Sequence, residues 1–143
     1  MAIFEQDITI HAPVNKVFNY IIDPANRVEW LRRVTDVRNI TGEGTGQKWD
    51  FTYKMPGKTI NGTVEVTEYI PDKRYAHKTS IGFARTWTYD FNTEDGNTHL
   101  NISVEMVSFR TPLLGRIIEK QVLRQSKREA DQAITNIKKK LEK

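Results

Sequence analysis

The 143-residue sequence predicts an α+β fold in which a seven-stranded antiparallel sheet packs against one long C-terminal helix. Three observations support this prediction. Apolar and polar residues alternate over residues 3–10 and again from about 35 to 108, as in half-buried strands. Apolar residues between 14 and 31 recur at helical spacing, and residues 112–141 form one long helical stretch. We expect a single domain spanning 1–143, because a chain of this length can bury one proper core.

The N-terminal third begins with a strand and continues with two short helices. The strand has one mainly apolar side, formed by Phe4, Gln6, Ile8 and Ile10. Pro13 suits the first turn of the next helix, where a missing N–H costs nothing. The apolar positions of that helix are Val14, Val17, Phe18, Ile21 and Ile22. Asp23-Pro24 ends it, and the following residues predict a second short helix carrying Val28, Trp30 and Leu31.

In two hairpins, the length of the turn sets which residues of the two strands pair. A two-residue turn at Pro56-Gly57 pairs Tyr53 with Ile60, Phe51 with Gly62, and Trp49 with Val64. A two-residue turn at Asp95-Gly96 pairs Phe91 with Leu100, Tyr89 with Ile102, and Trp87 with Val104. In both hairpins the turn length brings apolar side chains to the same face, which supports the register.

The strands between these hairpins allow more than one pairing. A two-residue turn at Pro71-Asp72 sets Val66 against His77 and points Tyr75, His77, Thr79 and Ile81 inward. A two-residue turn at Gly82-Phe83 would place Trp87 on the outer face of the sheet, which conflicts with its assignment to the inward face. A three-residue loop, Gly82-Phe83-Ala84, removes the conflict, and we favour it; it pairs Thr79 with Trp87 and His77 with Tyr89.

Glycines 42, 44 and 46 form a GxGxG stretch followed by Lys48, which raises the question of a phosphate-binding loop. A dinucleotide fingerprint needs GxGxxG before a helix, and a P-loop needs GK followed by Ser or Thr. Here Trp49 follows the lysine, and the next element is a strand, so no helix N-terminus points at a phosphate. The loop is better explained by tight turning between strands.

The buried stripe of the last helix has large residues at both ends and small residues in the middle. Its expected buried residues are Leu114, Ile118, Val122, Ser126, Ala130, Ile134, Ile137 and Leu141. Two interpretations remain open. The small residues either pack closely against a bulky sheet or leave room for a ligand between helix and sheet.

Composition limits the chemistry. The absence of cysteine excludes disulfides and thiolate chemistry, and the three histidines fall on different strands without ligand spacing, so we expect no metal and no other cofactor. No stretch approaches the ~18 apolar residues of a membrane span. The N-terminus lacks the apolar run of a signal peptide. We therefore expect a cytoplasmic protein without stable membrane insertion.

The net charge of +4 is unevenly distributed, with ten Lys/Arg and four Asp/Glu from Arg110 onward. A basic end of this kind can meet nucleic acid or an anionic surface, but it is more often the solvated face of a helix. The outward sheet face lacks the aromatic residues on which bases stack, so we expect no nucleic-acid binding. The sequence does not identify a protein partner.

Five segments give the chain a family resemblance: ITIHAPVNKVFNYIIDPANRVEW (8–30), GEGTGQKW, EVTEYIPDKRY, WTYDFNTEDGNTHL and AITNIKKKLE. Over nearly its whole length the chain resembles the START-like (SRPBCC) superfamily, in particular its polyketide cyclase/dehydrase and lipid-transport branch. The resemblance implies a helix-grip fold, in which a curved sheet wraps around the long C-terminal helix. It also implies a hydrophobic cavity between them, which suits the small middle of the helix stripe.

The residues expected to contact a ligand there come from the inward sheet face, the short helices and the last helix. They are Phe18, Trp30, Trp49, Phe51, Tyr53, Tyr75, His77, Thr79, Arg85, Trp87, Tyr89, Phe91, Ser126 and Ala130. Phe18 and Trp30 are placed near the mouth. Glu68 is a further inward candidate. A buried arginine needs an anionic partner, and for Arg85 we favour a solvent-exposed end of the sheet over a ligand oxyanion.

Three functions remain in view. The first is a carrier that binds a hydrophobic or amphipathic molecule such as a lipid, an isoprenoid or a polyketide. The second is a cyclase or dehydratase with His77 as general base and a tyrosine or Arg85 at the enolate oxygen. A hydrogen-bonded core histidine is favoured over this role, because Glu68 lies about 7–8 Å away diagonally. The third is a protein-interaction module without a ligand.

Overall fold

The computed structural model describes residues 3–81, 84–106 and 112–142, with the side chains of 3–4, 112–119 and 122–123 outside the description. The elements are β1 (Ile3–Ile10), α1 (Val14–Ile22), a 3-10 turn η1 (Pro24–Asn26), α2 (Arg27–Trp30), β2 (Val34–Thr41), β3 (Lys48–Met55), β4 (Lys58–Ile70), β5 (Arg74–Ser80), β6 (Ala84–Glu94), β7 (Asn97–Met106) and α3 (Pro112–Leu141).

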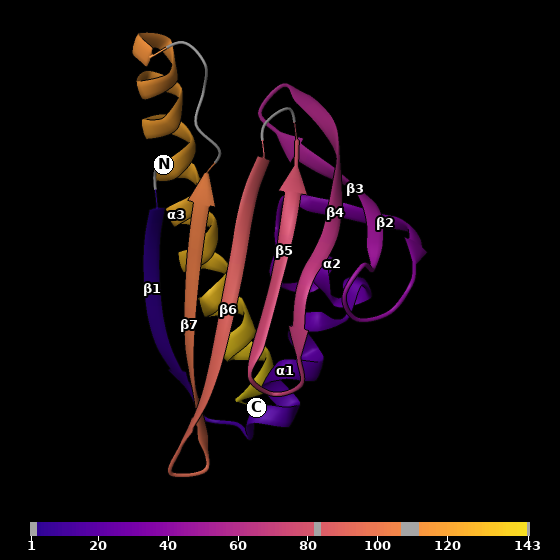
Figure 1. Cartoon of the computed structure of the whole chain (residues 1–143), viewed down its shortest axis with the longest axis vertical. Helices are drawn as coiled ribbons and strands as arrows, with labels where there is room; N and C mark the ends of the chain where they lie inside the picture. The colour runs from indigo at the N-terminus through magenta and orange to yellow at the C-terminus, as the bar shows by residue number, and fades with distance from the viewer. Residues whose placement is uncertain (1–2, 82–83, 107–111, 143) are drawn as a thin grey trace.

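The seven strands form one antiparallel sheet in the order β1-β7-β6-β5-β4-β3-β2. Helix α3 runs diagonally across one face of this sheet, and its C-terminal end lies near α1 (Figure 1). The predicted fold class is therefore confirmed: a seven-stranded antiparallel sheet, two short helices after the first strand and a long C-terminal helix.

The registers of the two outer hairpins are confirmed. Phe51 pairs with Gly62 and Trp49 with Val64, as the Pro56-Gly57 turn predicts. The Asp95-Gly96 turn gives all three predicted pairs of β6 with β7. Asp95 and Gly96 both have positive φ, at 52° and 80°, as a tight hairpin turn requires.

The two inner connections differ in detail from the prediction. Val66 does pair with His77, but Ile70 pairs with Arg74, so the turn is one residue longer and a β-bulge between Val66 and Glu68 restores the register. Strand β5 pairs His77 with Trp87, and Ser80 pairs with Ala84. The predicted pairing of His77 with Tyr89 is therefore wrong by two residues. Ala84 belongs to β6, whereas residues 82 and 83 of the predicted loop lie outside the described residues.

The second short helix of the prediction is present as η1 and α2, and Arg27 faces inward beside Trp30. Only one α-helical turn, α2, follows η1. Asp23 accepts a hydrogen bond from the Ala25 N–H at 3.0 Å, which sets the start of the turn. Arg27 and Trp30 are buried, three residues apart on one side, whereas Val28 is 44% exposed. Of the apolar residues that the sequence analysis assigned to this helix, Val28 therefore faces solvent.

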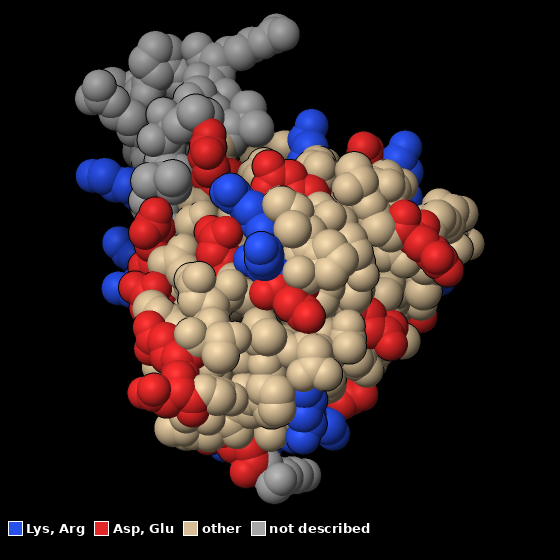
Figure 2. Space-filling view, turned by 60° about the horizontal axis from the view of Figure 1, so that its bottom comes forward, with Lys and Arg blue, Asp and Glu red and all other residues tan. Residues whose placement is uncertain are grey.

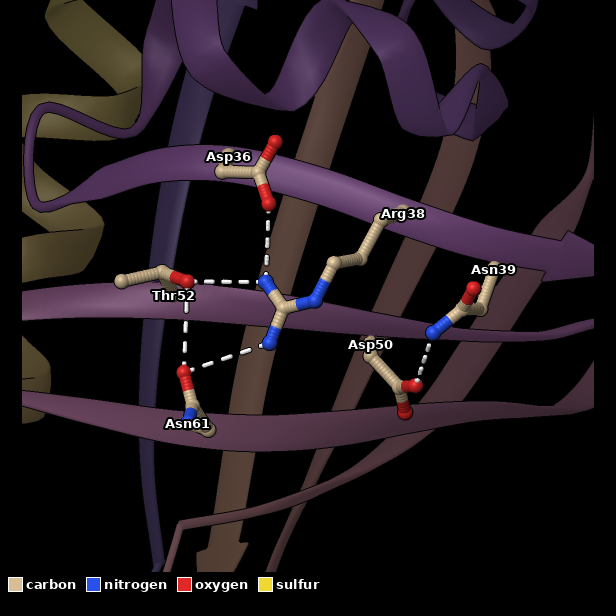
Figure 3. Close-up of polar contacts among 6 residues, drawn as sticks. All are labelled: Asp36, Arg38, Asn39, Asp50, Thr52 and Asn61. Carbon is tan, nitrogen blue, oxygen red and sulfur yellow. Dashed lines mark hydrogen bonds and ion pairs between the residues drawn. The ribbon is translucent and has the colours of Figure 1, made fainter.

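Polar side chains on the outer face hold the edge strand β2, whose pairing with β3 shifts register twice. The Arg38 guanidinium donates to Asp36 Oδ2 and to Thr52 Oγ1, each at 2.8 Å, and reaches Asn61 Oδ1 on β4 at 3.2 Å (Figure 3). Asn39 donates to Asp50 at 2.8 Å in the same view. These contacts fix β2 where its backbone ladder is interrupted.

The C-terminal end of α3 is tied to the start of the chain. Lys138 Nζ donates to the Thr9 carbonyl at 3.0 Å, and Asn136 donates to the Trp30 carbonyl at 3.3 Å. Within the predicted stripe, the described residues Ser126, Ala130, Ile134, Ile137 and Leu141 are all buried. The side chains of Leu114, Ile118 and Val122 lie outside the description. The small middle of the helix therefore faces the sheet.

The glycine loop leads from β2 into β3, and no helix begins there. Its three glycines have φ of 77°, 63° and 92°, a region that side chains disfavour. The Gly46 N–H donates to the Val66 carbonyl at 2.8 Å, so the loop packs against β4. This geometry agrees with a turn between strands. Within the described chain, no helix is long and apolar enough to cross a membrane.

Candidate functional site

A cavity of about 450 Å³ lies between the sheet and α3. Its apolar wall consists of Trp30, Leu31, Val34, Val37, Trp49, Phe51, Met55, Pro56, Val64, Trp87 and Ala133. Its polar interior groups are Arg27, Tyr53, His77, Thr79, Arg85, Tyr89, Gln125 and Glu129. The lining residues Arg32 and Arg33 of the α2–β2 connection, and Gln121, Arg124, Arg128 and Gln132 of α3, are exposed. The cavity therefore opens between this connection and α3.

Most of the residues expected to contact a ligand line this cavity. They are Trp30, Trp49, Phe51, Tyr53, His77, Thr79, Arg85, Trp87 and Tyr89. Tyr75, Ser126 and Ala130 are fully buried just outside it. Ala133, one helical turn after Ala130, lines it instead. The small residues in the middle of α3 thus leave room next to the sheet. The small residue that lines the cavity is Ala133, whereas Ala130 was expected.

Phe18 and Phe91 lie away from the cavity and pack against each other. Their ring centroids are 5.1 Å apart at an interplanar angle of 70°, and Phe18 also meets Tyr69 edge-on at 5.5 Å. Phe18 is 1% exposed and does not line the cavity, so its expected place at the mouth is wrong. This aromatic cluster holds α1 against the sheet.

Glu68 also differs from the expectation. Because of the β-bulge, it pairs with Ala76 and points to the outer face, where its carboxylate meets Arg74 at 2.9 Å. Its side chain is 50% exposed. A one-residue bulge reverses the faces of the strand residues that follow, which is why strict alternation misplaced it.

Arg85 is buried, contrary to the solvent-exposed end that we favoured. It is 3% exposed, and its Nη1 donates to Ser126 Oγ at 2.7 Å. The same nitrogen lies 3.6 Å from Glu129 Oε2. Its guanidinium also lies 5.4 Å from the Trp87 ring centroid. The negative charge that a buried arginine requires comes from α3, through a residue that the sequence did not single out.

Tyr53 shares the same carboxylate. Its hydroxyl donates to Glu129 Oε1 and accepts a hydrogen bond from Gln125 Nε2 at 3.0 Å. Burial, followed by the charge of Glu129, raises the pKa of Tyr53 well above its ordinary value. Tyr53 therefore remains a protonated donor, and Glu129 is already engaged by two side chains.

Arg27 is the principal site residue that the sequence analysis missed. It is 4% exposed, and its guanidinium lies 5.0 Å and 5.2 Å from the ring centroids of Trp30 and Trp49. Such cation–π contacts contribute about 0.5–2 kcal/mol each. Its polar contacts are to His77 Nε2 at 3.3 Å and to the Tyr75 hydroxyl at 3.4 Å. Once Trp30 is assigned inward, helical spacing places Arg27 beside it, and this was the available signal.

His77 is neutral in this setting. Burial lowers its pKa well below the ordinary value of 6.5, and the charges of Arg27 and Arg85 lower it further. Because arginine only donates, Nε2 of His77 accepts from Arg27 and Nδ1 carries the proton toward Thr79 Oγ1 at 3.1 Å. Burial also raises the pKa of Tyr89 to about 12, so this phenol stays protonated.

The cavity concentrates positive charge. Its lining contains six arginines and one glutamate, although the whole chain has a net charge of only +4. Elsewhere the signs are mixed: Figure 2 shows Lys and Arg interspersed with Asp and Glu over the face in view. No group of three or more acidic or histidine side chains in the described residues is placed to hold a metal ion.

The sequence matches a known protein family. A model of the family described as "Polyketide cyclase / dehydrase and lipid transport" matches residues 1–142. No curated protein matches the sequence.

Solved structures match over nearly the whole chain. Protein CV1439 from Chromobacterium violaceum superposes with a TM-score of 0.80 at 14% identity, covering 100% of this chain and 99% of that one. The Zhui aromatase/cyclase from Streptomyces sp. R1128 gives 0.79 at 18% identity, covering 99% and 93%. Ara h 8.0201 gives 0.78 at 16% identity, covering 98% and 97%. At these identities the likeness shows the fold alone.

Proposed function

The chain belongs to the polyketide cyclase/dehydrase and lipid transport family, and from this premise we propose that it binds a hydrophobic or amphipathic small molecule between the sheet and α3. The observation that supports the proposal is the cavity of about 450 Å³, with tryptophans on its wall and a few polar groups inside. Ligand sites commonly have this form, an apolar concavity in which a few polar groups orient the bound molecule.

The energy of binding comes from the apolar wall. A ligand that loses about 300 Å² of apolar surface to the cavity gains roughly 7 kcal/mol before the costs of association are subtracted. Trp49, Phe51 and Trp87 are each at most 5% exposed, so they are already ordered without a ligand. A wall that is formed in advance reduces the entropy lost on binding.

Binding without turnover is favoured over a cyclase or dehydratase reaction. A general base needs a free lone pair within reach of the substrate proton. The Nε2 lone pair of His77 accepts from Arg27, and Glu129 is shared by Tyr53 and Arg85. The cavity also gives little support to an interaction module without ligand, since such a protein would have a filled interior.

Two measurements test the proposal. Native mass spectrometry of protein purified from its own host should detect a bound small molecule of stoichiometric amount. In the second measurement, any bound molecule is first removed from the protein. The neutral fluorophore N-phenyl-1-naphthylamine should then bind saturably, at one site.

A pair of variants then locates the binding. Ala133→Phe places a ring in the cavity and should weaken the fluorophore affinity at least tenfold, whereas Thr135→Phe adds the same ring on the exposed side of α3 and should leave it unchanged. Circular dichroism confirms that both fold, with Ala133→Leu as the replacement should the larger ring unfold the protein. Absence of saturable binding, or equal binding by folded Ala133→Phe, would overturn the proposal.

A further inference from the structure

We propose that the cavity selects ligands with an oxyanion headgroup, such as a carboxylate or a phosphate, and that Arg27 is the residue that pairs with this group. The inference rests on the proposed function and deepens it by naming the ligand class. Four observations lead to it.

The first is that Arg27 is a buried cation without a carboxylate partner. In the described part of the chain, no Asp or Glu oxygen lies within 4.0 Å of its guanidinium. Its hydrogen-bond partners in the described chain, His77 and Tyr75, are both neutral. Removing a charge from water is unfavourable unless an opposite charge replaces the lost hydration. An anionic ligand would supply that charge at a residue lining the cavity.

The second is a pair of unused donors. Nε of Arg27 and Nε1 of Trp30 are both buried and have no hydrogen-bond acceptor. Both residues line the cavity, and they lie three residues apart on the same side of α2. An oxyanion offers several lone pairs on adjacent oxygens and is suited to accept from more than one donor. A neutral alcohol or ketone would leave the charge uncompensated.

The third is the contrast with Arg85. Both arginines are buried in the same cavity, but Arg85 has Glu129 at 3.6 Å and Ser126 at 2.7 Å. The chain supplies the counter-charge for one arginine from α3 and supplies none from its described residues for the other. This difference assigns ligand pairing to Arg27.

The fourth is the charge of the opening. Arg32, Arg33, Arg124 and Arg128 are exposed and surround the entrance. Within the described chain none of them makes an ion pair at 4.0 Å or closer. A positive entrance raises the local concentration of anions and favours their entry over that of cations.

A matched pair of probes tests the inference. 8-Anilinonaphthalene-1-sulfonate and N-phenyl-1-naphthylamine share one aromatic body, and only the first carries an oxyanion. The wild-type protein should bind the sulfonate at least tenfold more tightly. Arg27→Met should remove most of this preference while keeping the affinity for the neutral probe, and Arg27→Lys should restore part of it. Arg38→Met removes one arginine from the outer face of the sheet, where it does not line the cavity, and should leave the preference intact.

Each outcome decides a different point. If both probes bind the wild type equally, the inference fails and the proposed function stands. A sulfonate preference that is undiminished in folded Arg27→Met removes the role of Arg27. If neither probe binds, the proposed function fails, and this inference with it. Arg27→Gln replaces Arg27→Met should the latter not fold.

A competition experiment distinguishes the two headgroups. Decanoate and decyl phosphate should both displace the sulfonate probe, whereas decanol should need at least tenfold higher concentration. The more effective of the two anions identifies a carboxylate or a phosphate as the preferred group. Equal displacement by decanol would overturn the inference.

Discussion

His77 occupies the centre of the polar interior, and its surroundings hold it neutral. It is 2% exposed, stacks on Trp87 at 6.4 Å between ring centroids, and accepts from Arg27. Burial and two nearby guanidinium groups oppose its protonation. A protonated His77 would also turn its accepting nitrogen into a donor facing the donors of Arg27. The residue therefore links pH to the stability of the whole site.

The stability of the protein should fall below about pH 6.5 because of His77. Its folded pKa lies well below the ordinary 6.5, so the unfolded chain binds a proton in a pH range where the folded chain does not. Stability from this group is fully present above 6.5 and is lost as the pH falls toward the folded pKa. The slope is at most about 1.4 kcal/mol per pH unit.

Urea unfolding of wild type and His77→Gln between pH 8 and pH 5 measures this contribution. The difference between their free energies of unfolding should be constant above pH 7 and should shrink on acidification, since the glutamine does not titrate. Parallel curves over the whole range would show that His77 is not held neutral in the folded protein.

At the level of single elements, Gly62 shows how β4 makes space for its neighbours. It lies on the inward face opposite Phe51. A Cβ at this position would lie 2.3 Å from Ile81 Cγ2 and 2.6 Å from Phe51 Cζ. Both side chains are buried, and Phe51 forms part of the cavity wall. A glycine here lets two large side chains meet across the strand.

Gly62→Ala should therefore lower the free energy of unfolding by about 1–3 kcal/mol, the usual effect of overpacking. It should also weaken binding of N-phenyl-1-naphthylamine, because Phe51 lines the cavity and a shift of its ring changes the cavity wall. Thr63→Ala changes the next, outward residue of β4 and should alter stability by no more than about 0.5 kcal/mol. Urea unfolding and fluorescence titration measure the two effects. Equal stability of the two variants would contradict the close packing at Gly62.

The strand pairings show which features of an element can be predicted locally. The Pro56-Gly57 and Asp95-Gly96 hairpins were predicted correctly because a tight turn and the alternation of apolar residues constrain the same register. The β5–β6 register was wrong by two residues, a shift that keeps every side chain on its face and so leaves the pattern unchanged. The bulge after Val66 left no such signal in the sequence.

For the molecule as a whole, the distribution of charge matters more than its total. Positive charge gathers around the cavity, whereas both acidic and basic side chains occur over the face in Figure 2. Ions screen exposed charges over about 10 Å at 0.1 M salt. The four arginines at the entrance should therefore act mainly on how fast an anion arrives, and Arg27 on how long it stays.

Raising the ionic strength from about 0.02 to 0.2 M should slow association of the sulfonate probe several-fold and leave the neutral probe unaffected. Stopped-flow fluorescence measures both rates. The triple variant Arg32→Gln, Arg124→Gln, Arg128→Gln should lose most of this salt dependence. Arg33 is kept, because its guanidinium bonds to the Lys54 carbonyl at 3.3 Å. Unchanged salt dependence in the variant would show that the entrance charges do not steer the ligand.

The sequence alone determined the order of the elements, the faces of most strands and the small middle of the last helix. These properties depend on alternation, helical spacing and turn residues, all of which act over a few neighbouring positions. It also placed Trp49, Trp87 and His77 on the inward face, although their contact with a ligand stays a prediction.

Only the tertiary structure decided how the polar groups are paired. Arg85 meets Ser126 across 41 residues of sequence, Tyr53 meets Glu129 across 76, and Arg27 reaches His77 across 50. No local pattern records which buried arginine receives a carboxylate, because that depends on how α3 and α2 dock on the sheet. This docking places Glu129 next to Arg85 and leaves Arg27 facing the cavity. The partner of a buried charge depends on which residues the whole fold brings within a few ångströms of it.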